Sequence, residues 1–418
     1  MRKALFFMVL IAAVLLSACA NSGTPAAPTL AATQAATSGP QAQTAPTEDT
    51  SLPKMECKVV SLQATPGPTV VSAYPPVGAE DWVKGSQNPA MTITEYSDFQ
   101  CPYCSQFSAI LKELVEKHPD EVQLVFRHFP LPNHPLALTS AYAAEAAGRQ
   151  DKFWEMENIL FLQQSTWSAV TEAQFIEWVG NQANDLGLDT NRFSADMKDP
   201  AIIEKVKAAQ QHALNVKIPG TPFVLIDGRQ YDGPRDLTSL ESILELLRLE
   251  DRQFTYCPPM QIDPSKEYIA TIKTEKGDVK LQLFADKAPM AVNSFVFLAE
   301  NGWFDNVSFF SVKTNFVALT GDPSGTSFGS PGYTFANELS DLKFDKEGLV
   351  GMYNAGPGSN GSTFFITYAP APNLDGGYTI FGEVIEGMDV VKQLTPRDPQ
   401  QADQPPGDSM SAITIEEN

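Results

Sequence analysis

Two cysteines separated by Pro and Tyr, at residues 101–104, constrain this chain of 418 residues more than any other feature. A run rich in β-branched residues, 91–97, precedes the pair, and apolar residues follow it at helical spacing over about 105–116. This pattern predicts a strand that leads into the start of a helix. Backbone N–H groups are unpaired at a helix N-terminus and the helix dipole is positive there, so the position favours a thiolate.

A thiolate is the nucleophile of disulfide exchange. Cys101 lies at the mouth of the predicted turn and is expected to attack, whereas Cys104 is expected to resolve the mixed disulfide. The alternative is half of a structural zinc site, which needs four ligands. The other cysteines are isolated and the histidines show no ligand spacing (Cys19, Cys57 and Cys257; His118, His128, His134 and His212). We therefore expect a redox pair, with no metal and no cofactor.

The N-terminus has the features of an export signal. A basic start, residues 1–3, is followed by an apolar run, 4–16, that is too short for a permanent membrane span. The sequence Leu16-Ser17-Ala18-Cys19 resembles a bacterial lipobox, in which the cysteine is lipidated and becomes the first residue after cleavage. An ordinary secretory signal is the alternative. We favour a lipoprotein signal peptide over 1–19, with Cys19 anchoring the protein to the outer face of the bacterial cell membrane.

Residues 20–78 are rich in Ala, Thr and Pro and are expected to form a disordered tether, because most of this segment has few large apolar side chains to bury. The chain has 29 basic and 50 acidic residues and a net charge of −21. Nucleic acid is therefore not an expected partner. The acidity is instead expected to keep an exported protein soluble.

The first domain is expected over residues 79–250 and combines strands with helices. After the strand and helix around the cysteines comes a strand at 122–129, then a helical region, then a Thr-Pro turn, a strand and a hairpin turn at Asp227-Gly228. The remaining helices are predicted at 137–148, 151–162, 172–186, 201–215 and 237–249.

This order resembles the thioredoxin fold with a helical insertion, as in DsbA-type disulfide oxidoreductases. Besides Cys101 and Cys104, the resemblance rests on Glu95, where that family keeps a buried acid that accepts a proton. It also rests on Thr221-Pro222, where the family has a cis-proline loop that faces the cysteines and pairs with the substrate backbone. The resemblance implies a protein thiol–disulfide oxidoreductase with these five residues as its catalytic residues.

Tyr103 stands where strongly oxidising members of that family have His. A tyrosine cannot stabilise the neighbouring thiolate by charge, so we expect a less oxidising couple. The sequence leaves open the direction of electron flow and the redox partner. Cys57 and Cys257 flank this domain, and two cysteines left over in an oxidising compartment usually pair. We therefore expect a structural disulfide between them.

After a Pro-containing joint at 251–266, short strands alternate with Gly-rich turns, which indicates a β-barrel. Four strings resemble cyclophilins, the peptidyl-prolyl cis–trans isomerases; they lie at 284–295, 354–366, 374–377 and 380–388. The resemblance implies a cyclophilin-like domain over 267–396, which leaves 397–418 as a C-terminal tail.

In cyclophilins a hydrophobic pocket binds the proline ring, and an arginine donates to the prolyl nitrogen. That hydrogen bond weakens the amide resonance behind a barrier of ~18–20 kcal/mol. The resemblance assigns the pocket to Phe316, Asn354, Phe365 and Leu374. Ser311 replaces the catalytic arginine and Leu319 a downstream glutamine. We therefore expect binding of proline-containing peptides with reduced or absent isomerase activity; the alternative is that the pocket residues are only barrel core.

We thus expect a multidomain protein: an α/β thioredoxin fold with a helical insertion, followed by a mainly-β, cyclophilin-like closed barrel. It is expected to assist the folding of exported client proteins, in which disulfide exchange and proline isomerisation are both slow. Two alternatives remain. One is an active prolyl isomerase with an accessory thioredoxin domain, and the other is a membrane-tethered, peptide-binding chaperone without enzymatic activity.

Overall fold

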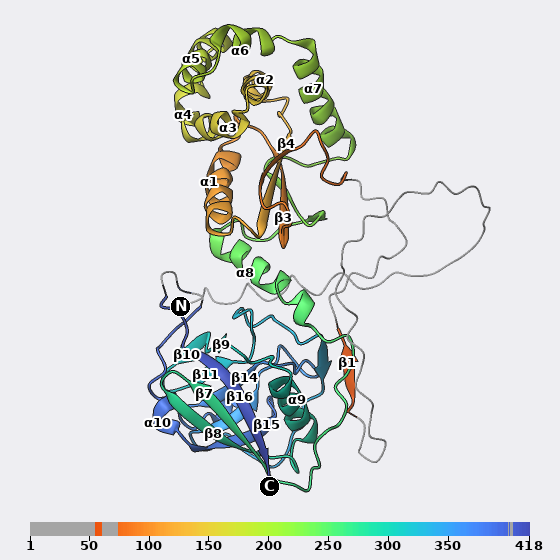
Figure 1. Cartoon of the computed structure of the whole chain (residues 1–418), viewed down its shortest axis with the longest axis vertical. Coiled ribbons are helices and arrows are strands. Elements are labelled where there is room, and N and C mark those ends of the chain that lie inside the picture. The colour runs from red at the N-terminus through yellow and green to blue at the C-terminus, as the bar shows by residue number, and fades with distance from the viewer. Residues whose placement is uncertain (1–54, 61–73, 400, 402–403) are drawn as a thin grey trace, which may run out of the picture. The chain divides into compact units, whose positions relative to one another are not determined.

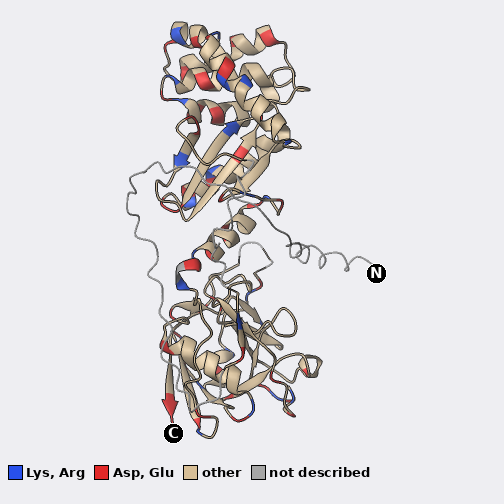
Figure 2. Cartoon of the chain, turned by 90° about the vertical axis from the view of Figure 1, so that its right-hand side faces the viewer, with Lys and Arg blue, Asp and Glu red and all other residues tan. Residues whose placement is uncertain are grey.

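The structure is a computed structural model that describes residues 55–60, 74–399, 401 and 404–418 (Figure 1). The predicted signal peptide, Cys19 and most of the predicted tether lie outside the described residues. Acidic and basic residues are spread over the described helices and strands (Figure 2). No helix within these ranges is both long and apolar enough to cross a membrane.

The first domain is built on a sheet with the strand order β2-β4-β3-β5-β6, in which β3 and β4 are parallel and β3 and β5 antiparallel. Its strands are β2 (Trp82–Gly85), β3 (Met91–Ser97), β4 (Val122–His128), β5 (Phe223–Ile226) and β6 (Arg229–Gln230). The hairpin between β5 and β6 turns at Asp227 and Gly228, which both have positive φ. This conformation favours Gly and tolerates Asp, so the sequence signal for the turn is confirmed.

Helices cover both faces of this sheet, and an insertion between β4 and β5 supplies most of them (Figure 1). The helices are α1 (Pro102–Lys117), α2 (Ala137–Gly148), α3 (Phe153–Leu162), α4 (Gln164–Trp167), α5 (Glu172–Asp185), α6 (Thr190–Asp196), α7 (Pro200–Asn215) and α8 (Leu237–Leu247). Several begin at side-chain caps: Thr171 and Gln174 form a capping box for α5, and Asp199 caps α7. This is the predicted thioredoxin-like region with added helices.

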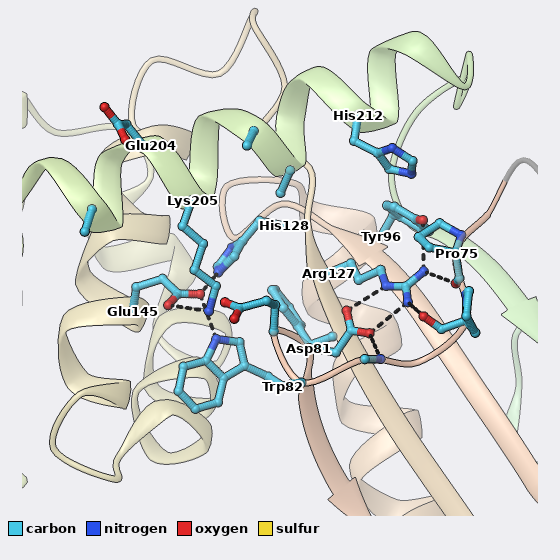
Figure 3. Close-up of a pocket in the computed structure, with 18 residues that line it drawn as sticks. Pro75, Asp81, Trp82, Tyr96, Arg127, His128, Glu145, Glu204, Lys205 and His212 are labelled. Carbon is cyan, nitrogen blue, oxygen red and sulfur yellow. Dashed lines mark hydrogen bonds and ion pairs between the residues drawn. The ribbon is translucent and has the colours of Figure 1, made fainter. Parts of the chain in front are cut away.

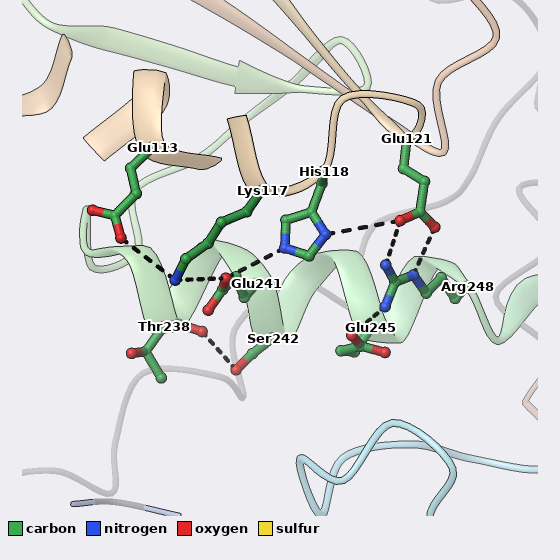
Figure 4. Close-up of polar contacts among 9 residues, drawn as sticks. All are labelled: Glu113, Lys117, His118, Glu121, Thr238, Glu241, Ser242, Glu245 and Arg248. Atoms are coloured by element: carbon green, nitrogen blue, oxygen red, sulfur yellow. Dashed lines mark hydrogen bonds and ion pairs between the residues drawn. The ribbon is translucent and has the colours of Figure 1, made fainter. Parts of the chain in front are cut away.

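Polar contacts hold α8 against the end of α1 and the loop before β4 (Figure 4). Arg248 donates from Nε to a carboxylate oxygen of Glu121 at 2.9 Å, and a hydrogen bond from Arg248 lowers the pKa of Glu121. About two turns back along α8, the Glu241 carboxylate lies 3.3 Å from the His118 ring nitrogen Nε2. The helix that closes the first domain is thus fixed by its polar face as well as by buried Leu240 and Leu244.

The second domain is a curled nine-stranded sheet with the order β10-β11-β14-β13-β15-β8-β7-β16-β9. Its strands are β7 (Tyr268–Thr274), β8 (Gly277–Leu283), β9 (Val307–Ser308), β10 (Ser311–Lys313), β11 (Val317–Thr320), β13 (Leu349–Met352), β14 (Phe364–Thr367), β15 (Ile380–Glu386) and β16 (Ser409–Glu417). Helix α9 (Pro289–Glu300) is almost wholly buried, and the short α10 (Met388–Val391) lies beside β8. This is the expected mainly-β class; the end strands β9 and β10 are not paired with each other in the strand order.

The predicted tail after residue 396 is wrong, because β16 belongs to this sheet. It pairs antiparallel with β7 along its length, and its Met410 and Ile413 are buried in the core. The sequence segments that resemble cyclophilins end before β16, and Ser and Thr interrupt the apolar residues of this strand. For these two reasons the sequence analysis did not predict it. The second domain therefore extends to Glu417.

The predicted tether is also wrong for its described residues 55–60. Strand β1 (Cys57–Val59) pairs with β12 (Tyr333–Phe335) of the second domain, and Met55 is buried in the core of that domain. Cys57 and Cys257 form a disulfide with their Cα atoms 5.9 Å apart, the pairing expected from the sequence. The interdomain segment 251–266 packs against the same region of the second domain, because Phe254 is buried and its N–H donates to the Pro331 carbonyl at 2.8 Å.

Replacing Cys57 and Cys257 together by Ser is expected to destabilise the second domain by up to about 5 kcal/mol, because the bond closes a loop with a sequence separation of 200. The comparison is best made in a protein whose Cys101 and Cys104 are already Ser, so that only this disulfide responds to reductant. Urea denaturation with and without reductant gives the difference. Equal midpoints would show that the bond adds no stability.

Candidate functional site

The two cysteines of the first domain lie where strand β3 leads into helix α1. Cys101 is the N-cap residue of α1, in an extended conformation, and Pro102 is the first helical residue. Both thiols are free and buried. The Cys101 Sγ lies 3.4 Å from the carbonyl oxygen of Thr221, and the Thr221–Pro222 peptide bond is cis. The structure thus brings together the helix start and the loop that the sequence pairs with it.

The two thiols differ in acidity. A hydrogen bond from the Cys104 thiol is the largest cause that lowers the pKa of Cys101 to about 5; the Thr221 side chain and the N–H groups of Cys104 and Tyr103 act in the same direction. Burial raises the pKa of Cys104 well above its usual value, and the hydrogen bond that it donates adds to this effect. Cys101 is therefore the thiolate at neutral pH, and Cys104 keeps its proton.

Glu95 lies beneath the cysteines on β3 and is only 2 % exposed. Burial raises its pKa to about 8, although the Ser97 hydroxyl donates to Glu95 Oε1 at 2.9 Å. A hydrogen bond from the Ser97 side chain also lowers the pKa of Cys104, which burial raises. The sequence analysis identified Glu95 but missed Ser97, which lies two residues on and on the same face of the strand.

A hydrogen-bonded loop fixes the position of Cys101. The buried Asp98 accepts from the N–H groups of Gln100 at 2.7 Å and Leu131 at 2.9 Å, and contacts the His134 ring at 2.7 Å. Gln164, from the helical insertion, donates to the Cys101 carbonyl at 2.9 Å. The sequence analysis missed Asp98; an Asp three residues before Cys101 is a turn-forming signal that could have indicated it.

The acidity of Cys101 predicts its reactivity with pH. The rate at which the reduced protein reacts with iodoacetamide at Cys101 is expected to be half-maximal near pH 5 and level above about pH 7. Because the folded pKa lies below the unfolded value of 9.0, the thiolate stabilises the reduced fold fully above pH 9 and loses this effect as the pH falls through about 5. Mass spectrometry of the alkylated residue measures the profile. A midpoint near pH 9 would contradict the assignment.

In the second domain, Ser311, expected at the position of the isomerase arginine, lies on β10 opposite a residue of the neighbouring strand. Ser311 pairs with Leu319 on β11, and Leu319 pairs with Phe365 on β14. Side chains directly opposite each other share one face of a sheet, so Ser311, Leu319 and Phe365 lie in one row on the same face. Ser311 is 7 % exposed. Leu319 packs with Phe365 and Leu374 in a cluster separate from the barrel core.

The other predicted pocket residues differ in their exposure and in their contacts within the domain. Phe316, the residue before β11, is 37 % exposed. The Asn354 side chain is occupied internally, because its amide nitrogen is 3.2 Å from Asn360 Oδ1 and its oxygen accepts from the Gly356 N–H. Phe365 is buried in a small hydrophobic core cluster, and the partly buried Leu374 packs against that cluster.

A hollow of about 740 Å³ lies beside β4 and α7, and neither cysteine lines it. Figure 3 shows Lys205, His128 and Trp82 turned towards the Glu145 carboxylate, at 2.9, 2.9 and 2.7 Å. Burial alone would raise the pKa of Glu145, but these partners outweigh it and lower the pKa to about 2. The Glu145 carboxylate is thus paired with its basic neighbours, and the hollow lies apart from the two cysteines.

Within the ranges that the structure describes, three or more His, Cys, Asp or Glu side chains do not gather as they would around a metal ion. Two histidines of the first domain are each bonded to one carboxylate: the partly exposed His134 to Asp98 and the buried His128 to Glu145. Their hydrogen bonds fix local structure.

The fold and the two sites define a protein with a thioredoxin-like domain followed by a prolyl-isomerase-like domain. The family model described as thioredoxin matches residues 79–246. The model described as cyclophilin type peptidyl-prolyl cis-trans isomerase/CLD matches residues 269–416, which includes β16.

Curated relatives match the second domain. Peptidyl-prolyl cis-trans isomerase-like 1 of Rhizopus delemar is 43% identical over 127 residues, which are 29% of this chain and 77% of the relative. Peptidyl-prolyl cis-trans isomerase A of Mycobacterium tuberculosis is 41% identical over 146 residues, 31% of this chain and 80% of the relative. A solved cyclophilin type isomerase of Cryptosporidium parvum, in the presence of the dipeptide Ala-Pro, is 33% identical with a TM-score of 0.33, covering 36% of this chain and 99% of that chain. The chain belongs to the cyclophilin family of peptidyl-prolyl cis–trans isomerases through its second domain.

Proposed function

We propose that this protein is an extracytoplasmic thiol–disulfide oxidoreductase that assists the folding of exported proteins. The observation that carries the proposal is the contrast between Cys101, an acidic thiol at the N-terminus of α1 opposite Thr221–Pro222, and Cys104, a protonated thiol near Glu95. A nucleophile, a resolving thiol and a base are the groups that disulfide exchange requires.

In the reducing direction, the Cys101 thiolate attacks a client disulfide, and the client's second sulfur leaves as a thiolate. Cys104 then gives its proton to Glu95 in the fraction of molecules in which that carboxyl is ionised, and attacks Cys101. The Sγ–Sγ bond between the two cysteines forms, the bond to the client breaks, and its electron pair leaves on the client sulfur. The client disulfide is reduced by two electrons and the dithiol is oxidised; the reverse sequence oxidises a client dithiol. Tyr103, which is 68 % exposed beside Cys101, is placed to contact the client.

We infer that the cyclophilin domain binds Xaa-Pro segments of the same clients and isomerises them slowly. Phe316 is exposed for the proline ring, but Ser311 has neither the reach nor the charge of an arginine. The second candidate, an active isomerase with an accessory redox domain, is favoured by the identity of 43% to a relative that is named as an isomerase.

We also propose lipid anchoring through Cys19 on the outer face of a bacterial membrane, since the sequence before it has the order of a lipoprotein signal. Metabolic labelling with palmitate tests this, with Cys19→Ser as the variant that should lose the label. Soluble wild-type protein without label would refute the anchor and leave the redox function standing.

Two assays on the full chain separate the candidate functions. We expect insulin reduction with a thiol donor and only slow isomerisation of a prolyl peptide in a protease-free assay. Fast isomerisation without insulin reduction would support the isomerase with an accessory domain. Neither activity, together with suppression of client aggregation, would support the non-enzymatic chaperone.

A further inference from the structure

A second buried carboxyl lies near the redox pair, on the helical insertion. Glu157 of α3 is 9 % exposed, and the Ser108 hydroxyl donates to its Oε1 at 2.8 Å. Ser108 follows Cys104 by four residues on α1, so both side chains lie on the same stripe of that helix. Glu157 therefore approaches α1 one turn beyond the resolving thiol.

Glu95 faces the same region from the sheet. It pairs in register with Phe126 of β4, and Phe126 belongs to the hydrophobic core that also contains Cys104. The negative charge of Glu157 is among the causes that raise the pKa of Glu95. The two carboxyls thus approach the surroundings of Cys104 from two sides, Glu95 from β3 and Glu157 through Ser108 on α1, although 62 positions separate them in the sequence.

Glu157, unlike Glu95, lines the hollow beside α1 and α3. Glu157 and Ser108 line a hollow of about 560 Å³, and Glu95 is not among its lining residues. A proton on Glu95 has no route of its own to water through this hollow, whereas a proton on Glu157 can leave directly. Glu157 therefore lies between the enclosed acid and the solvent.

The charged groups around Glu157 come from three elements. Lys112 of α1 donates to Asn158 Oδ1 at 3.2 Å, Lys84 of β2 lies 5.7 Å from the Trp154 ring centre, and Glu155 of α3 pairs with Lys152 at 2.6 Å. Burial raises the pKa of Glu157 to about 7, while Ser108, Lys84 and Lys112 oppose this. An acid that titrates near neutrality can both accept and release protons there.

We propose that Glu157 is a positioning residue for proton transfer, which carries the proton of Cys104 from Glu95 to the hollow beside α1 and α3. The inference rests on the proposed dithiol exchange. As Cys104 attacks the mixed disulfide, its proton passes to the Glu95 carboxylate, then to Glu157, and then to water. In the reverse direction Glu157 returns a proton to Glu95, which protonates Cys104 as it leaves.

The test measures the resolving step alone. Reduced full-length protein is mixed with oxidised glutathione over a range of pH, and mass spectrometry follows the glutathionylated intermediate. At saturating glutathione the rate of its decay reports attack by Cys104. Glu157→Gln keeps an acceptor for Ser108 but cannot carry a proton. We expect its plateau rate to fall about ten-fold, less than the about 10²–10⁴ of a direct general base, because solvent reaches Glu95 by slower routes.

Two comparisons separate proton transfer from a structural effect. Glu155→Gln makes the same charge change on α3 and should keep the wild-type rate. In a Glu95→Gln background, Glu157→Gln should cause no further loss, because both act on one proton. Added imidazole should speed Glu157→Gln but not wild type, since the hollow admits a small base; a folding defect would not be rescued in this way.

A wild-type plateau rate in Glu157→Gln, an independent further loss in the Glu95→Gln background, or absence of imidazole rescue would overturn the inference. The proposed function fails separately, and the inference with it, if the wild-type intermediate forms but never resolves, or does not form.

Discussion

Replacing Cys101 by Ser is expected to reduce disulfide exchange to the rate of the buffer alone, whereas replacing Cys104 by Ser is expected to accumulate mixed disulfides. Only Cys101 has both the lowered pKa and the position at the N-terminus of α1 beside Thr221–Pro222. A serine hydroxyl does not form a disulfide, so the first step is lost outright. With Ser at 104 the first step proceeds, and nothing inside the protein releases the client.

Insulin turbidity measures the loss, and non-reducing electrophoresis with mass spectrometry identifies the trapped conjugates. The Cys57→Ser/Cys257→Ser variant is the matched control, because it removes two sulfurs without touching the reactive pair and should keep its exchange rate at temperatures where it is folded. Alkylation of the reduced protein should label Cys101 first. Faster labelling of Cys104, or conjugates that form in Cys101→Ser, would show that the roles are reversed.

The sequence predicted the core of the redox site because local rules govern it. Strand β3 ends as expected at Ser97, and the helix after Cys101 begins at Pro102, where a missing N–H costs nothing. The partners that tune the site could not be found in this way. Ser108 and Glu157 meet across 49 positions, and Asp98 bonds to Leu131 and His134 from another loop. Such contacts depend on how the helical insertion packs, which hydrophobic periodicity does not specify.

In the second domain, two strands could not be predicted from the sequence. Its sequence segments identified the cyclophilin fold, but they end before β16, so a strand that lies between β7 and β9 in the sheet was taken for a tail. Strand β1 was missed for a similar reason, because three residues inside a polar segment carry almost no periodic signal. A strand of this kind forms only because the edge of β12 and the disulfide to Cys257 hold it in place. Both strands, β1 and β16, therefore form because they pair with strands that are distant in the sequence.

Replacing Ser311 by Arg is expected to raise the prolyl isomerase activity of this protein by about ten-fold or more. The wild type is expected to turn over on the order of 10²–10³ more slowly than an ordinary cyclophilin, the loss that follows removal of one transition-state donor. Phe316 holds the proline ring in both isomers, which aids binding but leaves the barrier unchanged. A guanidinium at 311, opposite Leu319 in the sheet, is placed to donate to the prolyl nitrogen where Ser cannot reach.

A protease-free assay on full-length protein measures the rate, and Ser311→Met is the matched control, since Met has similar length but no charge or donor. Peptide affinity should change little in either variant. The recovery should remain partial, because Leu319 supplies no hydrogen bond to hold the new side chain; Ser311→Arg combined with Leu319→Gln should exceed Ser311→Arg alone, since residues 311 and 319 lie directly opposite each other on β10 and β11. Wild-type turnover at the level of an ordinary cyclophilin would mean that another donor acts at this site. Equal gains from Arg and Met would show that bulk at position 311, rather than charge, limits the reaction.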